Sequence, residues 1–90
     1  IEVHPELCFM HMNNGVPMPY SKKTWNGMQH RLSLLTTTGI KLPNDMGPKT
    51  GIISSDDIID AAAVAWTVRR YAYGKALSYP EDHDSPQIWV

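Results

Sequence analysis

Three aspartates stand close together in the chain, at positions Asp56, Asp57 and Asp60. In a helix, residues three or four positions apart share a face, so Asp60 lies beside both of the other two. Carboxylates held this close repel one another unless a cation lies between them, and Mg²⁺ and Mn²⁺ prefer oxygen ligands. Such ions generate a hydroxide nucleophile and stabilise the leaving oxygen in phosphodiester cleavage. The spacing therefore predicts a metal-dependent hydrolytic site.

The same aspartates also have an interpretation without function. Acidic side chains in the first turn of a helix interact favourably with its dipole, which is sufficient for Asp56 and leaves Asp57 open. Asp60 lies deeper in the helix and directly precedes the packing residues Ala61–Ala63. Because the dipole does not explain an acid beside a packing face, Asp60 is the residue that favours a metal site.

The element that must position these acids is an alanine-rich helix. Serines followed by acids are typical of a helix start, and the apolar spacing predicts a helix from about Ser55 to Tyr73, closed by Gly74. So many alanines predict that the helix packs very closely on a sheet or on another helix. The predicted packing face contains Ile58, Ala61, Ala62, Ala65 and Ala72, widened by Ile59, Ala63 and Trp66.

Weaker patterns predict the remaining elements. Ile1–His4 alternates like a short strand ended by a proline, and Glu6–Met12 is a short helix candidate. A second long helix is predicted between an N-cap at Ser21 and a glycine stop at Gly39. The tail ends in a candidate edge strand, Gln87–Val90. The apolar stripe of the second helix consists of Trp25, Met28, Leu32 and Leu35.

Length and composition exclude several classes of protein. At 90 residues and 10.1 kDa the chain is one small domain at most, and its single cysteine, Cys8, cannot form an internal disulfide. We expect Cys8 to be buried and to pack like a small apolar residue. The longest apolar run, Ala61–Trp66, is too short to span a membrane, and the N-terminus lacks the pattern of a secretory signal. We expect a cytoplasmic protein without membrane contact, and the net charge of −1 does not indicate nucleic-acid binding by bulk charge.

Three stretches of the chain, in their order, carry a family resemblance. They are Ile1–Glu6 (IEVHPE), Lys22–Gly27 (KKTWNG) and Asp56–Trp66 (DDIIDAAAVAW). They resemble domain of unknown function family 429, described as predicted ribonuclease-H-like nucleases, whose members typically read E-V-[YH]-P-E, K-K-T-x-x-G and D-D-x-x-D-A-x-x-A-W. Asp57–Ala61 (DIIDA) also resembles the D-x-x-D-A motif in the final helix of RuvC-type members of the ribonuclease H superfamily. The resemblance covers nearly the whole chain, including the closing Gln87–Val90.

The resemblance implies an α/β fold. The chain would be the C-terminal fragment of a ribonuclease-H-like fold, mainly helical here, with two long helices, a short one and short strands near both termini. Residues 1–90 would form a single partial domain, from which the first three strands and the first catalytic aspartate are absent. Ile1–His4 corresponds to the fourth strand, so we expect its outer edge to lack a partner. We also expect a helix face formed by Ile58, Ala62 and Ala65 to be exposed or covered by a second copy of the chain.

The resemblance also implies a carboxylate site. By motif position, Glu2 is the strand carboxylate, and Asp57 and Asp60 are the helix pair. These three would be the catalytic residues and would bind Mg²⁺ or Mn²⁺. Glu6 is disfavoured because it follows Pro5, which ends the strand.

Lys22 and Lys23 lie at a helix start, where cations oppose the dipole. A nucleic-acid phosphate bound there would reverse that penalty. The simpler alternative is a solvated pair of lysines.

Two classes of function follow from these patterns. The first is a metal-dependent nuclease, in which this chain alone is inactive and the full-length protein contacts nucleic acid. The second is a small helical interaction or dimerisation module without catalytic activity, whose surfaces are the alanine-rich helix and the stripe of the second helix. Under either interpretation we expect self-association or contact with the missing N-terminal part.

Overall fold

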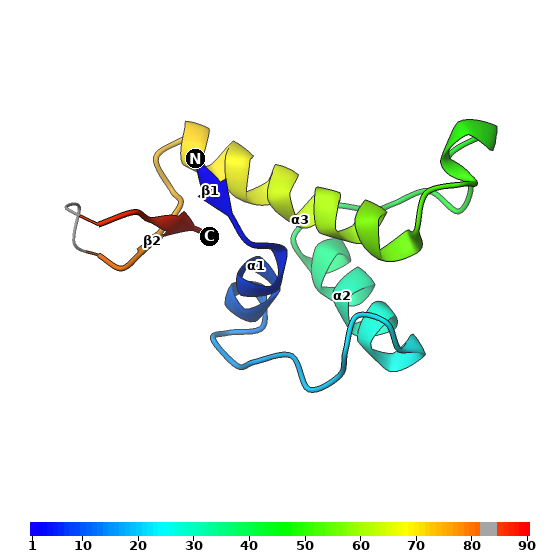
Figure 1. Cartoon of the computed structure of the whole chain (residues 1–90), viewed down its shortest axis with the longest axis horizontal. Coiled ribbons are helices and arrows are strands. Elements are labelled where there is room, and N and C mark those ends of the chain that lie inside the picture. Colours follow the sequence, from blue (N-terminus) through cyan, green and yellow to red (C-terminus); the bar gives the residue numbers. More distant parts are fainter. Residues whose placement is uncertain (82–84) are drawn as a thin grey trace.

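Three α-helices and a small three-stranded sheet make up the described part of the chain, residues 1–81 and 85–90 of a computed structural model (Figure 1). The two long helices, the short one and the strands near both termini confirm a mixed α/β chain that is mainly helical. In chain order the elements are β1 (Glu2–Val3), α1 (Pro5–Met12), α2 (Trp25–Thr37), the 3₁₀ helix η1 (Pro48–Thr50), α3 (Ser55–Ala72), β2 (Ser78–Tyr79) and β3 (Ile88–Trp89).

Helix α3 occupies almost the predicted range. Its first turn carries Asp56 and Asp57 and its last turn carries Arg69 and Arg70, so both ends complement the helix dipole. Gly74 follows the helix with a φ of 70°, a conformation that glycine adopts without strain.

The packing face of α3 is rotated from the predicted one. Its buried residues are Ile59, Ala63 and Thr67. Thr67 can be buried on this face because its hydroxyl group has a hydrogen-bond partner. Its oxygen lies 3.0 Å from the sulfur of Cys8. A prediction from apolar spacing alone could not include a threonine. It was wrong for three alanines that are exposed, namely Ala61, Ala65 and Ala72.

Helix α2 begins later than predicted. Its N-cap is Thr24 instead of Ser21, because the Thr24 hydroxyl oxygen accepts a hydrogen bond from the N–H of Gly27 at 3.1 Å. Trp25 is therefore the first helical residue. It is 70% exposed and does not belong to the buried stripe. The rest of the predicted stripe is buried or half-buried, and consists of Met28, Leu32 and Leu35.

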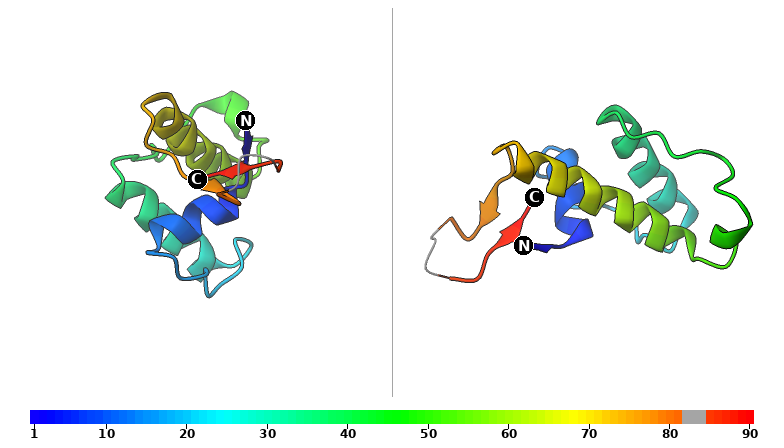
Figure 2. Two further views of the ribbon diagram at one scale, coloured as in Figure 1. Left: turned by 90° about the vertical axis from the view of Figure 1, so that its left-hand side faces the viewer. Right: turned by 90° about the horizontal axis from the view of Figure 1, so that it is seen from above.

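The core lies where α1 meets α2 and α3. Cys8 is fully buried there, which confirms its prediction as a small core residue. Figure 2 shows the sheet at one end of α3, and η1 toward the other end. The buried apolar residues of the core are Cys8, Phe9, Leu35, Ile59, Ala63 and Val90.

The sheet has the order β1-β3-β2, with β1 parallel and β2 antiparallel to β3. Among the described strands β1 pairs only with β3, so its outer edge is open, as expected. Of the helix face expected to be open, Ala65 is exposed, whereas Ile58 and Ala62 are half-buried. None of the helices described is long and apolar enough to cross a membrane.

Candidate functional site

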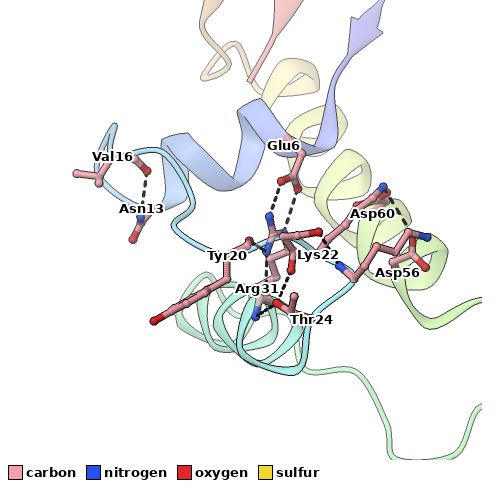
Figure 3. A network of polar contacts seen from close by, with 12 residues as sticks. Glu6, Asn13, Val16, Tyr20, Lys22, Thr24, Arg31, Asp56 and Asp60 are labelled. Atoms are coloured by element: carbon pink, nitrogen blue, oxygen red, sulfur yellow. Dashed lines mark hydrogen bonds and ion pairs between the residues drawn. The ribbon is translucent and has the colours of Figure 1, made fainter.

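Two carboxylates of α3 point at the same lysine (Figure 3). Asp60 Oδ2 accepts a hydrogen bond from Lys22 Nζ at 2.7 Å, and Asp56 Oδ2 lies 3.7 Å from the same nitrogen. The two aspartates stand four positions apart, so one helical turn brings them to the same face. Because only 13% of the Asp56 side chain and 18% of the Asp60 side chain is exposed, the pair is largely shielded from solvent.

Further hydrogen bonds keep Asp56 ionised. Lys23 Nζ donates to Asp56 Oδ2 at 2.8 Å, and the Ser54 hydroxyl donates to Oδ1. The Lys23 ammonium first, and then the Ser54 hydroxyl, hold the pKa of Asp56 well below its ordinary value. The stabilisation from Asp56 is therefore present above the ordinary aspartate pKa and is lost only as the pH falls through the lowered one. The hydrogen bond to Asp60 is likewise the main reason that the pKa of Lys22 is raised.

One oxygen of the pair has no hydrogen-bond partner. Asp60 Oδ1 is buried, and no donor in the described part of the chain reaches it. A buried acceptor without a partner costs about 1–3 kcal/mol, and more when it belongs to a charged group. A cation placed beside Asp60 Oδ1 would remove this cost.

The loop before α2 brings the two lysines to α3, and Gly27 makes its path possible. A Cβ atom on Gly27 would lie 1.9 Å from the carbonyl oxygen of Ser21, which is far inside van der Waals contact. Only glycine therefore lets this loop close against the first turn of α2. This explains a glycine in a helix interior, where it costs about 1 kcal/mol relative to alanine.

Gly27→Ala should lower the free energy of unfolding by about 1–3 kcal/mol, although alanine is the better helix former, because the Ser21 backbone must move. The same movement should draw Lys22 away from Asp60. Urea denaturation measures the first effect, and the chemical shifts of the Asp60 carboxylate measure the second. Gly51→Ala is the matched control, since its Cβ would meet only an ordinary contact at 3.4 Å. Wild-type stability in Gly27→Ala would contradict the packing argument.

An ion pair between the buried Arg31 and the half-exposed Glu6 also holds this loop. Arg31 is only 1% exposed, and its Nε donates to Glu6 Oε2 at 3.0 Å while its Nη2 donates to Oε1. Its Nη1 donates to the carbonyl oxygens of Tyr20 at 3.0 Å and Gly27 at 2.9 Å. One guanidinium group thus ties α1 to α2 and to the loop that leads to Lys22 (Figure 3).

The structure brings together only part of the predicted site. Glu2 is on the surface, where its Oε1 lies 2.9 Å from His4 Nε2, and Asp57 is exposed. Neither joins Asp60 at Lys22, and Asp56 does so instead. The four-residue spacing is the signal for Asp56, whereas the family motif favours Asp57.

The remaining charges of the predicted site are already engaged. Lys22 and Lys23, predicted to contact phosphate, both bind carboxylates of α3. Glu6 was disfavoured as a site residue, yet it binds Arg31 and contributes to the raised pKa of Lys22. The site therefore consists of ion pairs that join the start of α1 to α2, and the loop before α2 to the start of α3.

Asp56 and Asp60 are the two α3 carboxylates that could hold a divalent ion together. In the described residues, no group of three histidine, cysteine, aspartate or glutamate side chains could hold a metal ion. Mg²⁺, however, is usually bound through one or two carboxylates and completes its coordination with water and phosphate oxygens. Asp56 and Asp60 already reach one common cation, and Asp60 Oδ1 is an oxygen with free acceptor capacity.

A family model described as "Protein of unknown function (DUF429)" matches residues 1–85 of the chain. No curated protein and no solved structure matches the chain significantly. The family match confirms the resemblance to family 429 that the three sequence motifs predicted. The relation to the ribonuclease H superfamily stays a prediction.

Proposed function

The chain belongs to the DUF429 family of unknown function, and on this premise we propose that it serves the divalent-metal-dependent hydrolysis of phosphodiester bonds in nucleic acid. The observation that carries the proposal is the convergence of Asp56 and Asp60 on one lysine nitrogen, with a buried oxygen of Asp60 left without a partner. Two carboxylates on one face of a helix are oxygen ligands of the kind that Mg²⁺ uses, together with water and substrate phosphates. The D-x-x-D-A motif, which resembles that of RuvC-type nucleases, supports the same chemistry.

Each residue of the network has a role in this proposal. Asp56 and Asp60 would hold Mg²⁺ or Mn²⁺, with Asp56 in the place that the motif gives to Asp57. The bound ion would supply an activated water and neutralise charge on the phosphate. Lys22 balances the two carboxylates when no metal ion is bound. Once freed from them, Lys22 and Lys23 are well placed to bind the phosphate of the substrate strand.

A metal titration followed by nuclear magnetic resonance tests this proposal directly. Mn²⁺ should broaden the amide signals of the first two turns of α3 and of Lys22, because a paramagnetic ion relaxes nearby nuclei. Asp60→Asn should weaken the affinity at least tenfold, since even partners outside the coordination shell contribute about 10–100-fold. Asp57→Asn, with the same loss of charge three positions away, is the matched control and should bind almost as well as the wild type.

Two outcomes would contradict the metal site. One is an equal loss of affinity in Asp57→Asn and Asp60→Asn, which would indicate only diffuse attraction by the acidic helix start. The other is no broadening at all, together with concentration-dependent association in sedimentation velocity. That result would favour an interaction or dimerisation module, for which the exposed α3 residues Ala61, Ala65 and Val68 offer a surface.

A further inference from the structure

A second charged site lies at the other end of α3, away from the carboxylate pair. A cavity of about 400 Å³ opens there between the last turns of α3 and the end of α2. Three of its lining residues are cationic, and none is acidic. The cavity is lined by Thr38, Trp66, Arg69, Arg70, Tyr73 and Lys75.

Arg70 is held in the wall of this cavity by two contacts, and one of its guanidinium nitrogens has no acceptor among the described residues. Its guanidinium carbon lies 4.4 Å from the centre of the Trp66 ring, and its Nη2 donates to the carbonyl oxygen of Lys75 at 2.8 Å. Its Nη1 is buried, and no acceptor in the described residues reaches it. An anionic oxygen that reaches this nitrogen would supply the missing acceptor.

The other two cations, Arg69 and Lys75, have no carboxylate partner among the described residues. Both side chains are exposed. Beside them Tyr73 is 70% exposed, whereas both Arg70 and His11 pack against Trp66. The aromatic ring available for stacking is therefore that of Tyr73.

We propose that this cavity binds a phosphate group and an adjoining base of single-stranded nucleic acid. Arg70, Arg69 and Lys75 contact the phosphate oxygens, and the ring of Tyr73 stacks on the base. Cations next to an exposed aromatic ring are the features with which proteins bind single strands without reading their sequence. Because the net charge of the chain is −1, such binding depends on this local cluster and not on bulk charge.

Fluorescence anisotropy with a short fluorescein-labelled oligothymidine tests the phosphate contacts. The double variant Arg69→Ala/Lys75→Ala should bind at least tenfold more weakly, and the slope of log affinity against log salt should fall by about two, one for each lost phosphate contact. Lys41→Ala/Lys49→Ala removes two exposed lysines outside the cavity and should bind like the wild type. All four side chains are on the surface, so each variant keeps the fold, which circular dichroism verifies.

A second pair of variants tests the stacking contact. Tyr73→Leu should weaken oligothymidine binding but leave the binding of inorganic polyphosphate unchanged, because polyphosphate has no base to stack. Tyr20→Leu, which changes a tyrosine that is 51% exposed outside the cavity, should alter neither.

Three results would overturn the proposal. They are equal losses in the cavity variant and the Lys41/Lys49 control, unchanged binding in the cavity variant, and oligothymidine binding that is unchanged in Tyr73→Leu. The buffer contains EDTA, so none of these results depends on divalent metal. Failure of this proposal is therefore distinguishable from failure of the proposed hydrolysis, which the Mn²⁺ titration measures separately.

Discussion

Asp60→Asn should abolish Mg²⁺- or Mn²⁺-dependent hydrolysis of an oligonucleotide by the longest natural protein that contains these ninety residues. The amide keeps the shape of the carboxylate but removes the charge that shares a cation with Asp56. We expect the rate to fall at least a hundredfold, the scale on which loss of one preorganised electrostatic group lowers kcat. Gel assays of a labelled strand, with and without EDTA, measure the effect.

The controls for this experiment separate chemistry from folding. Asp60 also binds Lys22, so Asp60→Asn must first show the wild-type circular dichroism spectrum and urea midpoint to within a small shift. Asp57→Asn should keep most of the hydrolysis, because Asp57 is exposed and does not join the Lys22 contact. Full activity in Asp60→Asn would remove this residue from the site, and a wild-type protein that cleaves nothing would refute the proposed reaction itself.

The second large effect concerns stability. Glu6→Ala should lower the free energy of unfolding by about 3 kcal/mol, because it leaves the guanidinium of Arg31 charged and buried without its counter-ion. Arg31→Met should cost less, since half of the Glu6 side chain is exposed and its charge is solvated once released. Urea denaturation followed by tryptophan fluorescence measures both losses.

A double-mutant cycle makes this prediction specific. Glu6→Ala/Arg31→Met should be no less stable than Glu6→Ala alone, because the second change removes the charge that the first left unpaired. Losses that simply add would show that the ion pair is not the source of the effect. Because Arg31 also holds the carbonyl of Tyr20, each variant that replaces Arg31 should loosen the loop that carries Lys22 to α3.

The long helices of this fold could be predicted from local sequence patterns. The predictions were wrong where burial depends on contacts between residues distant in the chain. Helix α3 was predicted from about Ser55 to Tyr73 and spans Ser55–Ala72, because its serine start, acidic first turn and closing glycine are all local signals. Trp25 has the spacing of the apolar stripe but stands at the first position of α2. There the ring is 70% exposed. Spacing alone does not say where a helix stops touching its neighbours.

The contacts around Asp60 show the same division between local and distant signals. Asp60 was identified because its position in the helix has no local explanation. Asp56 was not identified as its partner, because residues three and four positions before Asp60 share a face with it equally well. Lys22 selects Asp56 through an ion pair at 3.7 Å between two residues that are distant in the chain. Glu6 was likewise missed because its role depends on how α1 docks against Arg31.

The buried cysteine has a practical consequence for the motions of this molecule. Cys8 is the single thiol of the chain, it is fully buried between α1 and α3, and burial raises its pKa. A disulfide reagent attacks the thiolate, so it modifies only molecules in which α1 has separated from α3. The rate of modification therefore reports how often this local opening occurs. The dependence of that rate on denaturant distinguishes opening of one helix from unfolding of the whole chain.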